Sequence, residues 1–156
     1  MNIDFLRNVS LFKGLNEEGL EALAELCFTR EFAKEGVIIL AEEEGDALFI
    51  IEEGQVKVCI SSEEGREVIL SLLGPGAVFG ELALLDGKPR SANVIATDDT
   101  SLVMLRRSDF QQLIYKTPQI AMALLAELAG RLRRTDRQIE GLALLDVTSR
   151  ISETLL

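Results

Sequence analysis

The sequence predicts a mainly β fold with flanking helices, in which a barrel or jelly roll is followed by one long helix. Two observations support this prediction. From about Phe28 to Arg107 the chain consists of short β-rich segments separated by glycines, about eight in number, which is typical of a barrel or jelly roll. From Thr117 to about Leu145 apolar residues instead recur at helical spacing, so this stretch is the longest predicted element.

Short helices are expected before the first strand. Residues Ile3–Leu15 are interpreted as a helical turn and a loop. Asn16 is a suitable N-cap, and Glu17 and Glu18 follow in the first turn, where the helix dipole favours negative charge. We therefore expect a second helix to begin directly after Asn16.

The strands are expected to pair with their neighbours in the chain, because short turns containing glycine or polar residues separate them. Three pairs are indicated: Ala47–Ile51 with Gln55–Ile60, Gln55–Ile60 with Glu67–Leu72, and Asn93–Thr97 with Ser101–Arg106.

Two helix starts follow the last strand. Ser108 with Gln111 resembles a capping box and predicts a short helix through Tyr115. Thr117–Pro118 is an N-cap followed by proline at the first helical position, and it starts the long helix.

The long helix carries an apolar seam whose intervals alternate between four and three, as in a coiled coil. The seam consists of Ala121, Leu125, Leu128, Leu132, Thr135, Ile139 and Leu142. A second copy of the helix is the simplest partner, so a parallel homodimer is predicted. In the alternative interpretation this face packs on its own barrel, although Leu124, Ala129 and Ala143 lie off the seam and are available for that contact.

Composition limits the function classes. The net charge is −10, with 26 acidic and 16 basic residues, so the chain as a whole is a poor nucleic-acid binder. The basic concentration Arg131–Arg137 is interpreted as a solvated helix face rather than a nucleic-acid patch. No apolar run approaches the ~20 residues that span a bilayer, and no secretory signal is visible, so a cytoplasmic protein without membrane contact is expected.

Histidine is absent and only two cysteines occur, which excludes several kinds of site. A jelly-roll metalloenzyme, a His-ligated haem sensor and His-based acid–base catalysis all need a residue that the chain lacks. An iron–sulfur sensor needs about four cysteines. Cys27 and Cys59 are therefore expected to be small core residues.

The segment Phe79–Val94 contains the candidate site. Gly80 precedes an expected short helix, Glu81 lies within an apolar run, and Arg90-Ser91 follows in a loop. Amides at a helix start, a guanidinium and a hydroxyl together suit one phosphate group. A carboxylate beside that phosphate needs a donor, such as a sugar hydroxyl. The segment thus predicts a pocket for a ribose and a phosphodiester. No metal or general base is visible, so we expect binding without hydrolysis.

This segment resembles the phosphate-binding cassette of cyclic-nucleotide-binding domains, because Gly80-Glu-Leu-Ala and Arg90-Ser-Ala match at nearly every demanding position. The whole chain resembles the sensor half of a regulator of the cyclic AMP receptor protein (CRP/FNR) family. Its closing stretch, Leu142–Ile151, is similar to that family's passage from sensor to DNA-binding domain. The resemblance implies a double-stranded β-helix over residues 1–116, a dimerisation helix over 117–145, and a hinge with the start of a DNA-binding domain over 146–156.

The resemblance also implies roles for individual residues. The backbone amides of Gly80, Glu81, Leu82 and Ala83 face the cyclic phosphate, with Arg90 and Ser91, and Glu81 accepts from the ribose 2′-hydroxyl. Val58 and Leu70, on adjacent expected strands, form an apolar wall, although a role in the core alone is also consistent with their positions.

The base is assigned through the long helix. In the family resembled, a threonine at the position of Thr135 contacts the adenine of cyclic AMP. Asp136 departs from the serine common in relatives and keeps cyclic GMP open. The ligand expected is cyclic AMP; the alternatives are cyclic GMP or cyclic di-GMP, or a ligand-free dimerisation module. DNA is expected as a partner only through a C-terminal domain absent from this chain.

Overall fold

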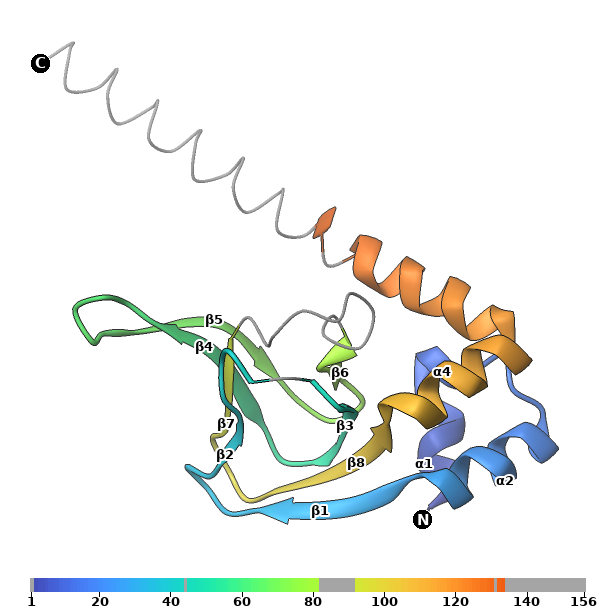
Figure 1. The fold of residues 1–156 in the computed structure, drawn as a ribbon. Helices are drawn as coiled ribbons and strands as arrows, with labels where there is room; N and C mark the ends of the chain where they lie inside the picture. Colours follow the sequence, from blue (N-terminus) through green and yellow to red (C-terminus); the bar gives the residue numbers. More distant parts are fainter. Residues whose placement is uncertain (1, 44, 82–91, 131, 134–156) are drawn as a thin grey trace, which may run out of the picture.

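Two four-stranded antiparallel sheets face each other and form a jelly-roll barrel (Figure 1). The computed structural model describes residues 2–43, 45–81, 92–130 and 132–133. The described strands are β1 Phe28–Phe32, β2 Val37–Ile39, β3 Ala47–Glu53, β4 Val56–Ser61, β5 Glu67–Leu73, β6 Val78–Phe79, β7 Asn93–Ala96 and β8 Thr100–Arg106. This architecture confirms the predicted fold class.

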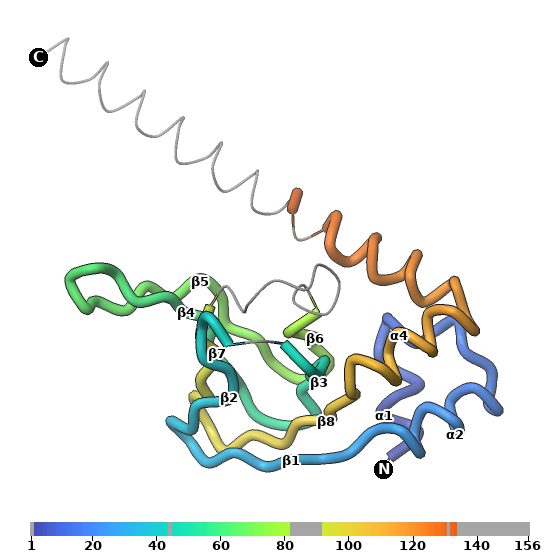
Figure 2. Tube along the Cα trace, in the orientation of Figure 1, coloured from blue at the N-terminus to red at the C-terminus, as the bar shows by residue number. Residues whose placement is uncertain are grey.

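Helices lie at one end of the barrel, as the tube in Figure 2 makes clear. The N-terminal ones are α1 Ile3–Asn8, the short 3-10 turn η1 Ser10–Phe12 and α2 Glu17–Leu26; α4 Arg107–Lys116 follows the last strand. Residues 118–130 form a further helix, to which 132 and 133 also belong. Within the part of the chain that the structure describes, no helix is long and apolar enough to cross a membrane.

Helix starts were predicted with mixed success. The Asn16 side chain accepts a hydrogen bond from the Gly19 amide at 2.8 Å, so the predicted N-cap of α2 is confirmed. The capping box at Ser108 is wrong. α4 begins at Arg107, two residues before the start that this box requires, and its N-cap residue, Arg106, makes no side-chain hydrogen bond to the first turn. The helix continues directly from β8, so its start is set by the strand and not by a local cap.

Two of the three predicted strand pairs are wrong. The helix-side sheet has the order β1-β8-β3-β6 and the outer sheet the order β2-β7-β4-β5. The β4–β5 hairpin is confirmed, but β3 and β4 lie in different sheets, as do β7 and β8. The first crossing uses Gly54 at φ +98°, where a Cβ atom would lie 2.5 Å from Thr100 Oγ1. The glycine therefore marks a passage between sheets and not a hairpin turn.

The strands β3 and β8 of the helix-side sheet are buried on both faces, which gives the molecule two apolar clusters. Toward the helices, Leu48 and Ile50 of β3 join Val103 and Leu105 of β8 in what we call the helix-side cluster. Between the sheets, alternate residues of the same two strands form the barrel cluster together with residues from the outer sheet. Period-two alternation thus supplies a core on each side.

The helix over 118–130 divides its apolar residues between the core and solvent. Ile120 and Leu124 are buried in the helix-side cluster. Leu128, assigned to the seam, also packs partly there, whereas Ala129, expected to be available to the barrel, is exposed. The exposed apolar stripe, which we call the helix stripe, consists of Met122, Leu125, Ala129 and Leu132.

Removing a β3 side chain that faces the helices should be costly. Ile50 is fully buried, so Ile50→Ala is expected to lower the free energy of unfolding by about 2–5 kcal/mol through lost burial and a cavity. Ile69 of β5 is 53% exposed, and Ile69→Ala should stay within about 0.5–1 kcal/mol. Urea unfolding followed by circular dichroism measures both; equal losses would contradict the assigned core.

Candidate functional site

The candidate site begins where β6 ends. β6 is only two residues long, but it pairs with β3 and both of its side chains are buried. The rings of Phe79 and Phe49 stack with centroids 5.0 Å apart and an interplanar angle of 5°. This ring contact helps to fix β6 beside β3 in the helix-side sheet, directly before Gly80.

Gly80 and Glu81 turn the chain out of the sheet. Gly80 has φ +86°, a left-handed conformation that costs a residue with a Cβ atom free energy, and Glu81 is already helical. This agrees with the sequence interpretation of a glycine opening a helix. An amide-lined turn at this point depends on the glycine.

Glu81 is buried, with 2% of its surface exposed. Among the described residues, the other buried polar or charged residue is Thr100, whose hydroxyl donates within the turn that follows β7. Burying a carboxylate is unfavourable unless hydrogen bonds and charges compensate it. Glu81 is therefore not a surface carboxylate, and its position inside the end of the barrel makes it a candidate ligand contact.

The far end of the segment is also fixed. Asn93 begins β7, and its side-chain oxygen accepts a hydrogen bond from the Ala41 amide at 2.7 Å. β7 belongs to the outer sheet and β6 to the helix-side sheet. The two ends of the candidate segment are thus attached to opposite walls of the barrel.

The two predicted wall residues differ in environment. Val58 on β4 pairs with Val94 of β7 and packs against the barrel cluster. Leu70 on β5 is 57% exposed, and it has no register partner because Val58 pairs with Ser71 while Cys59 pairs with Ile69. Val58 is therefore part of the barrel interior, whereas Leu70 presents its side chain to solvent or to a partner.

An ion pair stabilises the β4–β5 hairpin beside Val58. Lys57 Nζ lies 2.6 Å from Glu67 Oε1, and this hydrogen bond lowers the pKa of Glu67 and raises that of Lys57. A carboxylate with a lowered folded pKa stabilises the fold above its unfolded pKa. That contribution is lost as the pH falls through the lowered value.

Both cysteines are buried and protonated. Burial raises the pKa of Cys27 to about 12 and also raises the pKa of Cys59. Cys27 belongs to the helix-side cluster, as predicted for a small core residue. In the described ranges, no group of three or more Cys, Asp or Glu side chains is arranged to hold a metal ion.

Four of the ten predicted site residues can be placed. Gly80 and Glu81 are adjacent at the end of β6, and Val58 and Leu70 lie on neighbouring strands of the outer sheet. The remaining site residues lie outside the described part: Leu82, Ala83, Arg90, Ser91, Thr135 and Asp136. Their roles stay predictions.

Comparison with known proteins places this geometry in a family. The model of the cyclic nucleotide-binding domain family matches residues 29–117. The chain is 38% identical over 138 residues to the cAMP-activated global transcriptional regulator CRP of Pasteurella multocida, with 88% of this chain and 66% of that protein covered. It is 37% identical over 152 residues to the cyclic AMP receptor protein of Thermus thermophilus, with 97% and 70% covered.

The fold agrees with this assignment. The crystal structure of the Thermus thermophilus catabolite activator protein matches with a TM-score of 0.77 at 36% identity, over 86% of this chain and 63% of that one. The chain thus spans about two thirds of the length of these relatives. It belongs to the cyclic nucleotide-binding domain family. The Pasteurella multocida relative is named as a global transcriptional regulator.

The turn at Gly80 gives a test of the local geometry. Gly80→Ala should lower the free energy of unfolding by about 1–2 kcal/mol, because alanine is strained at φ +86°. Gly74 has open space around its Cβ position and no positive φ, so Gly74→Ala should be neutral or slightly stabilising. Thermal unfolding of the two variants distinguishes them, and a neutral Gly80→Ala would argue against this turn.

Proposed function

We propose that the chain is the cyclic AMP sensor of a dimeric cytoplasmic transcription regulator. The observation that carries the proposal is the carboxylate of Glu81, buried directly after a left-handed glycine at the end of β6. A family that binds cyclic nucleotides, and relatives named for cyclic AMP, support this ligand.

In this proposal different groups of the protein bind the phosphate, the ribose and the base of the nucleotide. Backbone amides of the Gly80–Ala83 turn and the hydroxyl of Ser91 donate to the cyclic phosphate, and Arg90 adds a charge-assisted hydrogen bond. Glu81 accepts from the ribose 2′-hydroxyl, which uses the carboxylate without bringing it into repulsion with the phosphate. Val58 supplies apolar wall from the barrel side, and Leu70 covers sugar and base from β5.

Base selection is assigned to Thr135, whose hydroxyl meets the adenine edge. Asp136 provides a second acceptor that also suits the N1–H and amino group of guanine, so cyclic GMP is the alternative ligand.

Calorimetric titration with cyclic AMP, cyclic GMP and cyclic di-GMP tests the proposal. Cyclic AMP should bind most tightly, and absence of heat with all three would leave only a dimerisation module.

The cassette arginine gives a sharper test. Arg90→Ala should weaken cyclic AMP binding by about 2–5 kcal/mol, the cost of truncating one partner of a buried charge pair. The control is Arg66→Ala in the β4–β5 turn, where the side chain is 84% exposed. Calorimetric titration with cyclic AMP should show a loss of affinity in Arg90→Ala and none in Arg66→Ala. An unchanged affinity in Arg90→Ala refutes the proposed role of Arg90.

The helix stripe supports the proposed homodimer. Leu125 and Leu132 are 58% and 63% exposed, and Met122 is 67% exposed, although each is a large apolar side chain. Two parallel copies of this helix would cover the stripes of both protomers. Because Thr135 is predicted from the sequence to lie on the same helix, filling the nucleotide site would connect the ligand to the interface.

Charge in the stripe should break the dimer. Leu132→Glu is expected to shift the sedimentation profile to the monomer, since two like charges would face each other without solvent. Leu40→Glu is the matched control, because Leu40 directly follows β2, is not part of that helix and is 48% exposed. A dimer that persists in Leu132→Glu would disprove the helix interface.

The proposed output is a change in the dimer. A ligand shifts a conformational equilibrium only by the difference between its affinities for the two states. In the regulator proposed here, that difference would set the orientation of a helix-turn-helix domain following residues 146–156.

A further inference from the structure

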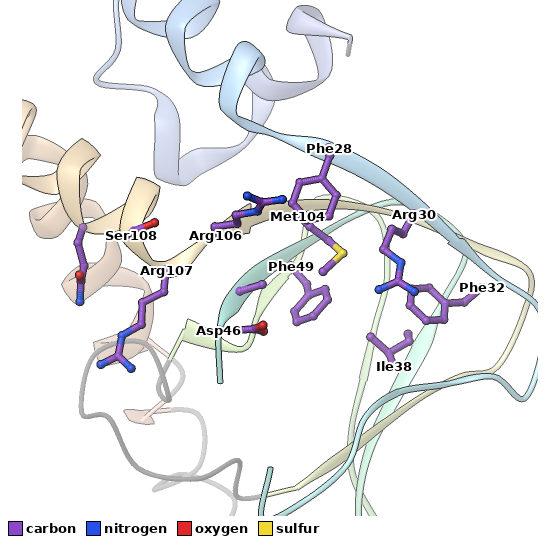
Figure 3. Close-up of a pocket in the computed structure, with 12 residues that line it drawn as sticks. Phe28, Arg30, Phe32, Ile38, Asp46, Phe49, Met104, Arg106, Arg107 and Ser108 are labelled. Carbon is purple, nitrogen blue, oxygen red and sulfur yellow. The ribbon is translucent and has the colours of Figure 1, made fainter. Parts of the chain in front are cut away.

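A cavity of about 640 Å³ lies on the inner face of the helix-side sheet (Figure 3). Its walls come from β1, β3 and β8, with Ile38 of β2 and the start of α4 completing them. Of the predicted nucleotide-site residues, the four that the structure describes (Val58, Leu70, Gly80 and Glu81) do not line it. Small-ligand sites in proteins have volumes of about 300–1,000 Å³, so the cavity is of the right size for such a ligand.

The cavity combines aromatic walls with cationic side chains. Phe28, Phe32 and Phe49 contribute rings, and Arg30 and Arg106 also line the cavity. The Arg30 guanidinium lies 5.4 Å from the centroid of the Phe32 ring, and that of Arg106 lies 5.5 Å from the Phe28 centroid, as Figure 3 shows. Cation–π contacts of this kind hold a guanidinium in place and leave its edge free to donate.

These arginines are available as donors. Arg107 is the third arginine in the lining, and within the described ranges no ion pair involves any of the three. Asp46 is the carboxylate in the lining, so the cavity carries a net charge of +2 in a chain whose net charge is −10. Positive charge concentrated in this way favours an anion.

The start of α4 adds to the positive potential. Ser108 and Gln111 line the cavity from this ten-residue helix, whose positive dipole end lies at its N-terminus. Arg106 does not cap the first turn with its side chain, and Asp109 is the acidic residue there. The Arg107 amide already donates to the Asp46 carbonyl at 2.9 Å, so side chains rather than this amide would bind the ligand.

From this arrangement we infer that the cavity is a second ligand site, for a small organic anion with a planar apolar body and a carboxylate or phosphate head. The apolar body rests against the phenylalanine rings, and Arg106, beside the start of α4, donates to the head. The inference does not depend on the proposed nucleotide site, because none of the four described residues of that site lines the cavity. It assigns the protein a second chemical input.

Naphthalene-2-carboxylate is a suitable probe, and naphthalene-2-carboxamide is its neutral match. The chain has no tryptophan and one tyrosine, so naphthalene fluorescence anisotropy can be read with little protein background. The carboxylate should bind, and the carboxamide should bind at least about tenfold more weakly, the loss expected for a charge-assisted contact.

Substitutions of arginines that line the cavity test whether the probe binds there. Arg106→Gln should weaken binding of the carboxylate about tenfold and Arg30→Gln should weaken it less, whereas Arg66→Gln, on the β4–β5 turn, should leave it unchanged. Circular dichroism confirms that the exposed substitutions leave the fold intact, and saturating cyclic AMP should not displace the probe. The inference is overturned if the carboxylate does not bind, if the carboxamide binds equally well, if neither arginine variant has an effect, or if cyclic AMP competes.

Discussion

The burial of β3 and β8 on both faces of the helix-side sheet is the constraint on which the rest of the structure depends. β3 and β8 place alternate side chains in the helix-side cluster and in the barrel cluster. A slip of one residue would exchange the two sets of side chains, so the register of this sheet is strongly specified. β6 pairs with β3, and α4 continues from β8, so the candidate nucleotide segment and the start of the C-terminal helices both inherit their positions from these two strands.

The sequence predicted the strands better than their partners. Period-two patterns and glycines located most strands to within one or two residues, because those signals are local. Pairing is not local. In a jelly roll, neighbours in the chain often belong to opposite sheets, and the glycine between β3 and β4 is explained by its contact with the distant Thr100. The same limit applies to α4, whose first residue follows from the end of β8 and not from the capping signal at Ser108.

The candidate site was likewise predicted from the sequence only in part. The motif starting at Gly80 indicated a phosphate and a sugar, and its glycine conformation and the burial of Glu81 agree with that interpretation. Burial itself could not be predicted from a carboxylate in a short apolar run. The cavity in Figure 3 gave no sequence signal, because Phe28, Asp46 and Met104 come from distant segments that only the sheet brings together.

β5 has a consequence for the behaviour of the protein in concentrated solution. It is the last strand of the outer sheet, and Val68, Ile69, Leu70 and Leu72 are each 45–57% exposed. An apolar edge strand is a template for pairing with other chains and for fibril growth. The irregular register at Leu70 interrupts the row of backbone donors and acceptors, and the ion pair of Glu67 adds charge at the start of the strand. Both features oppose unwanted edge-to-edge assembly while the apolar side chains remain accessible for recognition.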